Sequence, residues 1–388
     1  MEFQEIPAPF DGFIRDLVAR RGAPSGLLDA PIDPRDEMFF KGVLPSYGGD
    51  VGRASFRYFE SAVRTFEVYA QLADKLGGFD RLERVLDFGS GWGRLTRALS
   101  QVMPADRIWV TDLYHEAVAW LAETYGVHGV LSAEHPDRFK VEGSFSLVFA
   151  ASVFSHLPDA LFRAWLQRLY RLVAPNGLLA FSVHHSDLLP EGERSEAAAL
   201  AYHGWSESGS LGADVYGMSY VAEPYVAAAV RELRPGRPPQ MRRFARGLFE
   251  NQDLYVVAGD EVDISRLHLD ISPLGGMRPM EASGPQDVVL QGWGVDFNPA
   301  SQIERVELAM GDHVVATAQP TADNEAALAI FPNPPNMPVR WTMTVRRDQL
   351  EPGRMLRVAL RSARSQRIAY AYAASPAGVD DVSALGRT

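Results

Sequence analysis

Residues 85–94 read Val-Leu-Asp-Phe-Gly-Ser-Gly-Trp-Gly-Arg, and they are the strongest indication of the fold in the sequence. Its first four residues are mostly apolar and predict a short strand, while Leu95, Leu99 and Val102 recur at helical spacing. Between them, glycines at alternate positions predict a turn whose backbone can take positive φ and approach a ligand closely. A helix that starts from such a turn presents free backbone N–H groups. The stretch therefore predicts a ligand-binding turn between a strand and a helix.

Two phosphate-binding loops compete with this interpretation. A dinucleotide site needs G-x-G-x-x-G, whereas Gly89, Gly91 and Gly93 are spaced G-x-G-x-G. A P-loop needs Gly-Lys followed by Ser or Thr, and the sequence lacks it here. Asp87, two residues before the first glycine, disfavours a pyrophosphate and suits a cationic ligand. A nucleotide-cofactor oxidoreductase is therefore the weaker alternative.

Strand-like and helix-like segments alternate on both sides of this turn. Phe145–Ala151 is almost wholly apolar, as is typical of a central parallel strand. The alternation predicts an α/β fold: a doubly wound, Rossmann-like, mostly parallel sheet of seven strands with helices on both faces. We expect strands at 84–88, 107–111, 127–131, 145–151 and 178–183, helices at 115–125, 159–173 and 223–233, and a hairpin of 241–246 with 253–258.

A second acid stands at the end of the second predicted strand. Asp112 follows Trp109-Val110-Thr111, nineteen residues after Gly93. A carboxylate at this tip can accept hydrogen bonds from both hydroxyls of a ribose. In register with the glycine turn, Asp112 predicts a nucleoside-containing ligand.

These residues together resemble the cofactor loop of class I S-adenosylmethionine (SAM)-dependent methyltransferases, and the resemblance covers roughly residues 53–258. Phe145–Pro158 resembles the family's fourth strand and the turn after it, and residues 172–181 resemble its fifth strand. The loop is similar to that of bacterial members with Asp-Phe-Gly-Cys-Gly-His-Gly-Arg, from which Ser90 and Trp92 depart. The resemblance implies SAM as cofactor and methyl transfer to an acceptor hydroxyl or amine.

The resemblance also implies where the cofactor is bound. Ala133 and Glu134, after the third strand, are expected near the adenine. No His, Asp or Glu set has metal-ligand spacing and the chain has no cysteine, so we predict no metal. The implied cofactor contacts are Asp87, Phe88, Gly89, Ser90, Gly91, Gly93, Arg94, Asp112, Leu113, Ala133, Glu134 and Ser152.

Histidines at the ends of two strands are the candidate catalytic residues. A hydroxyl acceptor benefits from a base that takes its proton, and His156 follows the fourth strand. His184 and His185 end the fifth strand, and since neighbours on a strand face opposite ways, only one of them can point into a given cleft. We predict His156 and His184 as catalytic, against the alternative that each is structural. Tyr216 and Tyr220 are either acceptor-pocket or packing residues.

We divide the chain into four segments. We expect an N-terminal arm at 1–80, whose helix at 53–76 covers the active site, and a methyltransferase domain at 81–260, with a lid-like insertion at 191–217. A β-sandwich domain is expected at 261–376, followed by a tail at 377–388. In the β domain, Trp293 and Trp341 could stack on sugars, but we favour packing in the core. The expected strands there are 267–271, 288–295, 303–310, 313–318, 340–345, 355–360 and 368–372.

Composition bounds the partners. The chain has 388 residues, 46% hydrophobic and 22% charged, which is typical of a globular protein. Its net charge of −11 argues against nucleic acid as a partner. No apolar run is long enough for membrane insertion, and the N-terminus has no signal-peptide pattern, so we expect a cytoplasmic protein.

The acceptor is left open by the sequence. A small molecule or a glycan fits, with the hydroxyl of a glycan or nucleotide sugar slightly favoured by association with the family. The alternative function is a catalytically silent SAM-binding domain that serves a glycan- or protein-binding β module. The oligomeric state is open, and a homo-oligomer is one of the alternatives.

Overall fold

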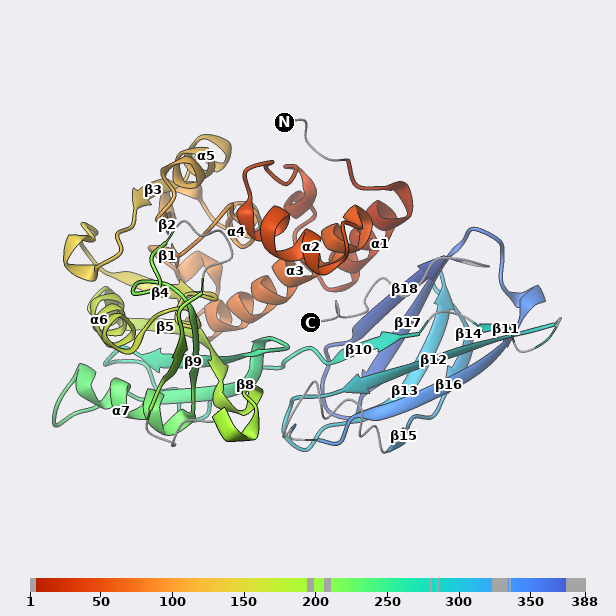
Figure 1. Cartoon of the computed structure of the whole chain (residues 1–388). Coiled ribbons are helices and arrows are strands. Elements are labelled where there is room, and N and C mark those ends of the chain that lie inside the picture. Colours follow the sequence, from red (N-terminus) through yellow and green to blue (C-terminus); the bar gives the residue numbers. More distant parts are fainter. Residues whose placement is uncertain are drawn as a thin grey trace. The chain divides into compact units, whose positions relative to one another are not determined.

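The computed structural model describes residues 5–193, 199–205, 211–278, 281–282, 284, 286–322, 334 and 336–374. They form two compact units (Figure 1), one with residues 23–42 and 61–269 and one with 5–22, 43–60 and the chain from 270 onward. None of the described helices combines the length and apolarity needed to cross a bilayer. The predicted tail at 377–388 and parts of the predicted insertion, 194–198 and 206–210, lie outside the described residues.

A nine-stranded sheet is the centre of the first unit (Figure 1). Five strands run parallel in the order β3-β2-β1-β4-β5, β9 pairs antiparallel with β5, and β8 pairs antiparallel with β9. These are the seven predicted strands, to which the short strands β6 and β7 are added. The strands are β1 (Val85–Phe88), β2 (Ile108–Asp112), β3 (His128–Leu131), β4 (Phe145–Ala150), β5 (Val173–His185), β6 (Ala201–His203), β7 (Met218–Val221), β8 (Met241–Phe249) and β9 (Gln252–Ala258).

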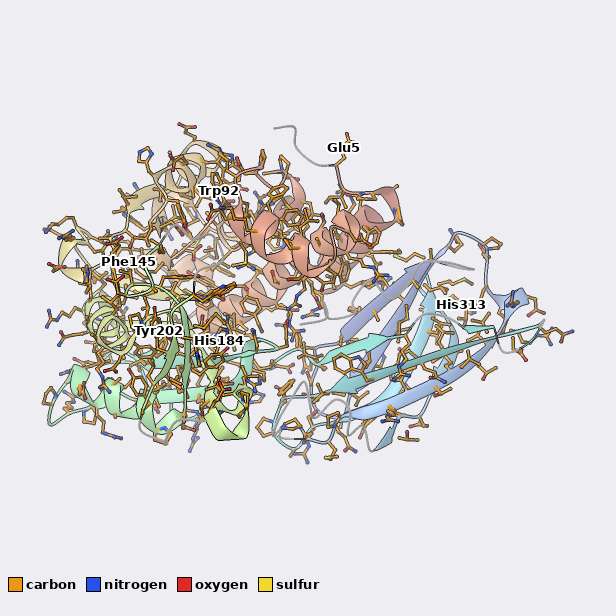
Figure 2. The ribbon with its side chains drawn as sticks, viewed as in Figure 1. Glu5, Trp92, Phe145, His184, Tyr202 and His313 are labelled. Carbon is orange, nitrogen blue, oxygen red and sulfur yellow. The ribbon has the colours of Figure 1, made fainter. Side chains whose placement is uncertain are left out.

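Helices cover both faces of this sheet, which confirms the doubly wound fold. On one face, Phe88 of β1 lies 4.7 Å, centroid to centroid, from Trp165 of α6 (Asp159–Tyr170), and α7 (Glu223–Leu233) joins the same core. On the other face, Asp87 accepts a hydrogen bond from Thr96 of α4 (Thr96–Val102). Side chains of successive strand residues point to opposite faces, so α4 and α6 lie on opposite sides. Helix α5 (His115–Tyr125) follows β2. Phe145 of β4, labelled in Figure 2, is fully buried within the unit.

The end of β5 carries the two additional strands. His184 pairs with Gln252 of β9 on one edge and with Tyr220 of β7 on the other. Strand β4 ends at Ala150, opposite Phe181, so β7 takes the part of the edge that lies beyond β4. The hairpin of β6 and β7 is therefore at the carboxyl edge of the parallel strands, where ligands bind in such sheets.

Two antiparallel sheets form the second unit and share one core, as predicted for a sandwich. Burial alternates strictly along β16, and Trp341 is only 2% exposed in this core, which confirms its packing role. Helix α1 (Ala8–Arg20) joins the unit through Phe13, which stacks on Tyr372. The strands are β10 (Leu274–Met277), β11 (Glu281–Ala282), β12 (Asp287–Val295), β13 (Ile303–Met310), β14 (His313–Ala318), β15 (Thr321–Ala322), β16 (Val339–Arg346), β17 (Met355–Ser362) and β18 (Ala369–Ala374).

One strand prediction is wrong, and the units cut across the predicted segments. Residues 267–271 form no strand, because the backbone N–H and carbonyl of Ile271 bond to the side chain of Asn298 instead of a neighbouring strand. Helix α3 (Val51–Lys75) belongs to the second unit up to Glu60 and to the first from Ser61 onward. The boundaries 1–80, 81–260 and 261–376 remain predictions.

Candidate active site

The glycine turn after β1 has the backbone conformation that its sequence predicts. Gly89, Gly91 and Gly93 have φ of 71°, 53° and 81°. A Cβ on Gly93 would clash with the side chain of Leu121 on α5, so this glycine allows the turn to pack under the helix. A Cβ on Gly91 would meet nothing within 4 Å, because Gly91 borders an open cavity. Gly91 therefore exposes its backbone to a ligand.

Asp112 fixes this turn at the end of β2. Its carboxylate accepts hydrogen bonds from the backbone N–H of Gly91 at 2.8 Å and of Tyr114 at 3.1 Å. Burial raises the pKa of Asp112, and these N–H groups act in the opposite direction. The carboxylate also borders the cavity, so it keeps a side free for ligand hydroxyls.

The cavity runs along the carboxyl edge of the sheet. Apolar walls surround a few polar groups, as is typical of small-ligand sites. Its charged residues are four acids, Asp36, Glu37, Asp112 and Glu134, and two bases, Lys41 and Arg94, which suits a cationic ligand. Glycine backbone, the Asp112 carboxylate and an acidic lining are groups that fit SAM. The predicted residues that line the cavity are Phe88, Gly89, Ser90, Gly91, Arg94, Asp112, Leu113, Ala133, Glu134, Ser152 and His156.

Three predicted site residues are not among those that line this cavity. Gly93 lies below the turn, against Leu121. His184 is 3% exposed and lies behind His156, with 6.0 Å between the ring centroids. Asp87 is 3% exposed and accepts a hydrogen bond from Thr96 at 3.0 Å. The structure thus places Asp87 under the glycine turn, where it joins β1 to α4.

Burial makes Asp87 a group that titrates near neutrality. Desolvation raises its pKa to about 7, with the charge of Asp112 adding to the shift and Thr96 opposing it. Because this pKa exceeds the value in the unfolded chain, the contribution of Asp87 to stability is lost as pH rises from about 4 to 7.

We therefore expect Asp87→Asn to stabilise the ligand-free protein at alkaline pH. The gain in the free energy of unfolding should approach about 4 kcal/mol above pH 7 and shrink toward pH 5. The amide stays uncharged at every pH, whereas the carboxyl group of Asp87 becomes a buried charge as pH rises. Thermal midpoints of both proteins between about pH 5 and pH 8.5 would measure it. An equal difference between the two proteins at every pH would show that Asp87 does not titrate in this range.

Ser152 takes a strained conformation at the end of β4. Its φ is 56°, which is unusual for a residue other than glycine. The backbone N–H of Ser152 donates to Ser182 at 2.8 Å, and the amide of Gln252 donates to the Ser152 hydroxyl at 2.8 Å. Gln252, at the start of β9, was not predicted as part of the site. It fixes a turn that borders the cavity.

The N-terminal part of the first unit adds residues that sequence reasoning missed. Asp36, Glu37, Met38 and Lys41 border the cavity, and the last two lie in a π-helical turn, Met38–Val43. The guanidinium of Arg97 on α4 donates to the carbonyls of Leu27 and Ala30, at 3.2 and 2.9 Å, and so anchors this segment. The sequence there is rich in Pro and Asp and carries no motif that would reveal the contact.

His156 is the histidine that reaches the cavity. Its Nδ1 lies 2.7 Å from the carbonyl of Gly217, and its ring stacks on Tyr216. Burial lowers the pKa of His156 to about 4, although the bond to Gly217 acts in the opposite direction. The imidazole is therefore neutral near pH 7 and can accept a proton or a hydrogen bond.

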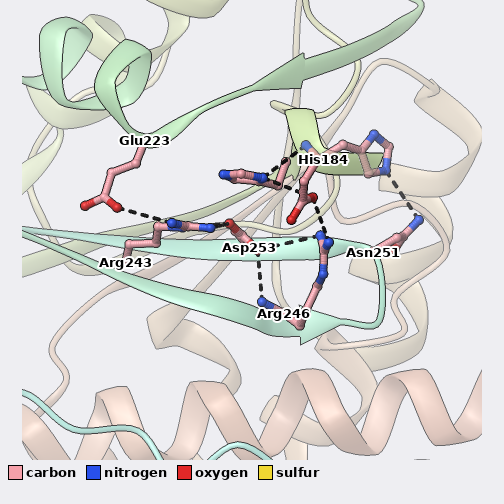
Figure 3. Close-up of polar contacts among 8 residues, drawn as sticks. His184, Glu223, Arg243, Arg246, Asn251 and Asp253 are labelled. Carbon is pink, nitrogen blue, oxygen red and sulfur yellow. Dashed lines mark hydrogen bonds and ion pairs between the residues drawn. The ribbon is translucent and has the colours of Figure 1, made fainter. Parts of the chain in front are cut away.

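A buried ion-pair network lies beside His184, at the hairpin of β8 and β9 (Figure 3). Arg243 donates to Asp253 at 2.7 Å and to Glu223 at 3.2 Å. Arg246, with φ of 50°, donates its backbone N–H to Asp253 and its guanidinium to Asp187. None of these residues borders the cavity. The network therefore has a structural role: it ties the hairpin of β8 and β9 to Asp187 and Glu223, and each buried charge in it has a partner of opposite sign.

No group of three or more potential metal-ligating side chains occurs among the described residues. The cavity instead offers backbone, carboxylate and imidazole groups.

Comparison with known proteins places this site in a family. Residues 61–218 match the family described as methyltransferase domain. The malonyl-[acyl-carrier protein] O-methyltransferase of Prosthecochloris aestuarii is 26% identical over 145 residues, which are 36% of this chain and 53% of that protein. The chain thus spans about half the length of this curated relative.

Solved methyltransferase structures are also similar, at low identity. The 1,6-didemethyltoxoflavin N1-methyltransferase of Burkholderia thailandensis, with bound 1,6-didemethyltoxoflavin and S-adenosylhomocysteine, is 20% identical, with 59% of this chain and 92% of that chain covered and a TM-score of 0.36. The O-methyltransferase NcsB1 of neocarzinostatin biosynthesis, bound to SAM and 2-hydroxy-5-methyl naphthoic acid, is 14% identical, with 65% and 69% covered and a TM-score of 0.36.

The family match covers strands β1 to β6, the glycine turn and the carboxylate of Asp112, and the residues at the cavity fit the cofactor that the resemblance implied. Residues 61–218 therefore form a methyltransferase domain, and the cavity beside its glycine turn fits SAM as the cofactor.

Proposed function

We propose that this protein transfers the methyl group of SAM to a hydroxyl group of a small-molecule acceptor, and that His156 receives the hydroxyl proton. One observation carries this proposal: His156 borders the same cavity as the glycine turn and Asp112. Bound SAM supplies an electrophilic methyl group on a sulfonium. In the transfer, the acceptor's O–H bond and the sulfonium S–CH3 bond break and an O–CH3 bond forms, while the proton goes to His156.

The chain's own residues bind, orient and exclude water. The Gly91 backbone and the Asp112 carboxylate hold the cofactor's polar groups, and Ala133 and Glu134 border the expected adenine end. We assign Met38, Leu211 and Val215, which are apolar and line the same cavity, to the acceptor end. Such walls exclude water and align the acceptor, which is most of what methyl transfer requires from a protein.

The weak basicity of His156 indicates how acidic the acceptor hydroxyl group should be. Burial lowers the pKa of His156 to about 4, so it is a weak base, which matches an acidic hydroxyl group better than a weakly acidic one. A phenol or enol matches it better than an alkyl alcohol. We therefore place a phenol-like hydroxyl ahead of the glycan or nucleotide-sugar hydroxyl suggested by the sequence, and ahead of an amine.

We expect His156→Gln to lower methyl transfer at least about 100-fold, the usual contribution of a positioned base, with the SAM dissociation constant unchanged. The assay offers labelled SAM with phenols, sugars and amines, and identifies the methylated product. His128→Gln is the matched control, because His128 also stacks on an aromatic ring, Trp109, but does not border the cavity.

Each outcome decides between functions. Equal turnover of wild type and His156→Gln on a hydroxyl acceptor would remove His156 as the base. Transfer to a sugar but not to phenols would restore the glycan expectation. SAM binding with no transfer to any of the three classes would favour the silent SAM-binding domain.

A further inference from the structure

The segment before β7 is bonded to the turn that carries His156. The backbone N–H of Gly217 donates to the carbonyl of His156 at 2.9 Å, and that of Ser219 donates to the carbonyl of Ser155 at 2.8 Å. The Ser219 hydroxyl donates to the carbonyl of Leu157 at 2.5 Å. Three consecutive residues of the turn are thus tied to one short segment, so the two move as a unit.

The imidazole itself makes two further contacts with this segment. Nδ1 of His156 is 2.7 Å from the carbonyl oxygen of Gly217, and the ring of Tyr216 lies parallel to the imidazole, at 4.5 Å between centroids and 7° between planes. A carbonyl oxygen only accepts, so Nδ1 carries the proton of the neutral imidazole. Nε2 is then the unprotonated nitrogen, which can accept a proton.

His156 lines the cavity, and its Nε2 makes no hydrogen bond with any residue that the structure describes. Nε2 is therefore the ring nitrogen that can accept a hydrogen bond from a ligand. His184, by contrast, has a buried Nδ1 and contacts Tyr220 instead of the cavity. The two histidines at this edge therefore differ in access to a ligand.

We infer that Tyr216 and Gly217 are positioning residues for His156: the stacked ring and the carbonyl hold the imidazole in one tautomer, with Nε2 toward the acceptor. This inference rests on the proposed function, since it assigns a role to the segment that seats the proposed base. The same segment contributes Leu211 and Val215 to the cavity wall, so the insertion before β7 both positions His156 and borders the acceptor.

Gly217 is confined by β6 as well as by His156. A Cβ at this position would clash with the carbonyl oxygen of His203 and would approach the ring of Tyr202 at 2.7 Å. The close pairing of β6 and β7 thus fixes where the Gly217 carbonyl points. Because Gly217→Ala would displace the hairpin, Tyr216 is the better residue to test.

The first readout is the tautomer of His156, which needs no acceptor. In the full chain with 15N-labelled histidine, two-bond nitrogen–proton spectra near neutral pH should show His156 in the Nδ1–H form alone, identified by its loss in His156→Gln. Tyr216→Phe keeps the stack and should leave the signal unchanged. Tyr216→Leu removes the stack that keeps the ring in line with the Gly217 carbonyl, so the imidazole can turn away from that carbonyl and should give a mixture of both tautomers.

The second readout is methyl transfer to phenol as probe. Tyr216→Leu should lower kcat about tenfold or more with the SAM dissociation constant unchanged, and Tyr216→Phe should restore the rate. In a His156→Gln background, Tyr216→Leu should have no additional effect, because the residue it positions is gone. If Tyr216 contacted the acceptor directly, the two losses would multiply.

The two proposals fail in different ways. A normal rate in His156→Gln would overturn the proposed base and this inference with it. A slow His156→Gln combined with a Tyr216→Leu protein that keeps one tautomer and a normal rate would overturn only the positioning role.

Discussion

Asp112→Ala is expected to weaken SAM binding about 100-fold or more while the protein remains folded. The carboxylate is the predicted acceptor for both ribose hydroxyls, and a hydrogen bond to a charged group contributes about 1.5–3 kcal/mol. The same carboxylate holds the N–H of Gly91 at 2.8 Å, so its loss also frees the glycine turn. Calorimetric titration with SAM measures the change.

Two further variants separate binding from stability. Asp112→Asn keeps the size of the side chain and one carbonyl oxygen, so its loss of affinity should be smaller, about tenfold. Asp106→Ala removes an exposed carboxylate in the turn just before β2 and should not alter binding. Affinity of Asp112→Ala within about threefold of wild type would mean that the ribose lies elsewhere.

Gly91→Ala is expected to cause the second large loss, by filling space that the ligand needs. Nothing in the protein lies within 4 Å of the added Cβ, so the fold can accommodate it, at about 1–2 kcal/mol for an alanine at positive φ. The methyl group would instead project where the backbone borders the cavity. We expect SAM affinity to fall at least about tenfold, measured by the same titration.

Gly126 provides a matched control for this variant. It ends α5 with φ of 68°, and an added Cβ would meet only Ala105, at 3.8 Å. Gly126→Ala should therefore cost similar stability and leave SAM binding unchanged. Equal affinities of the two alanine variants would contradict the placement of the cofactor against Gly91.

The part of the site that the sequence predicts is local in the chain. The glycine turn, Asp112 and the strands that carry them follow one another within a short segment, so their periodicity and turn residues suffice to place them. His156 was predicted from its place after β4, and Ser152 from the same turn. A residue just after a parallel strand lies at the carboxyl edge of the sheet, so the strand assignment alone places His156 and Ser152 near the site.

The rest depends on contacts between distant segments. Met38 and Lys41 reach the cavity because Arg97 anchors the segment before them, and nothing in the local sequence reports this bond. Asp87 was predicted at the cofactor, but alternation along β1 turns it toward α4. Strand β10 carries two glycines, Gly275 and Gly276, which weaken any strand pattern, so the sequence favoured residues 267–271 instead.

Calorimetric titration of the wild-type chain with SAM and with S-adenosylhomocysteine is the decisive experiment for the cofactor site. Both ligands are expected to bind at one site per chain, with micromolar or tighter affinity. If neither ligand binds a folded, monodisperse sample, the glycine turn and Asp112 do not form a SAM site.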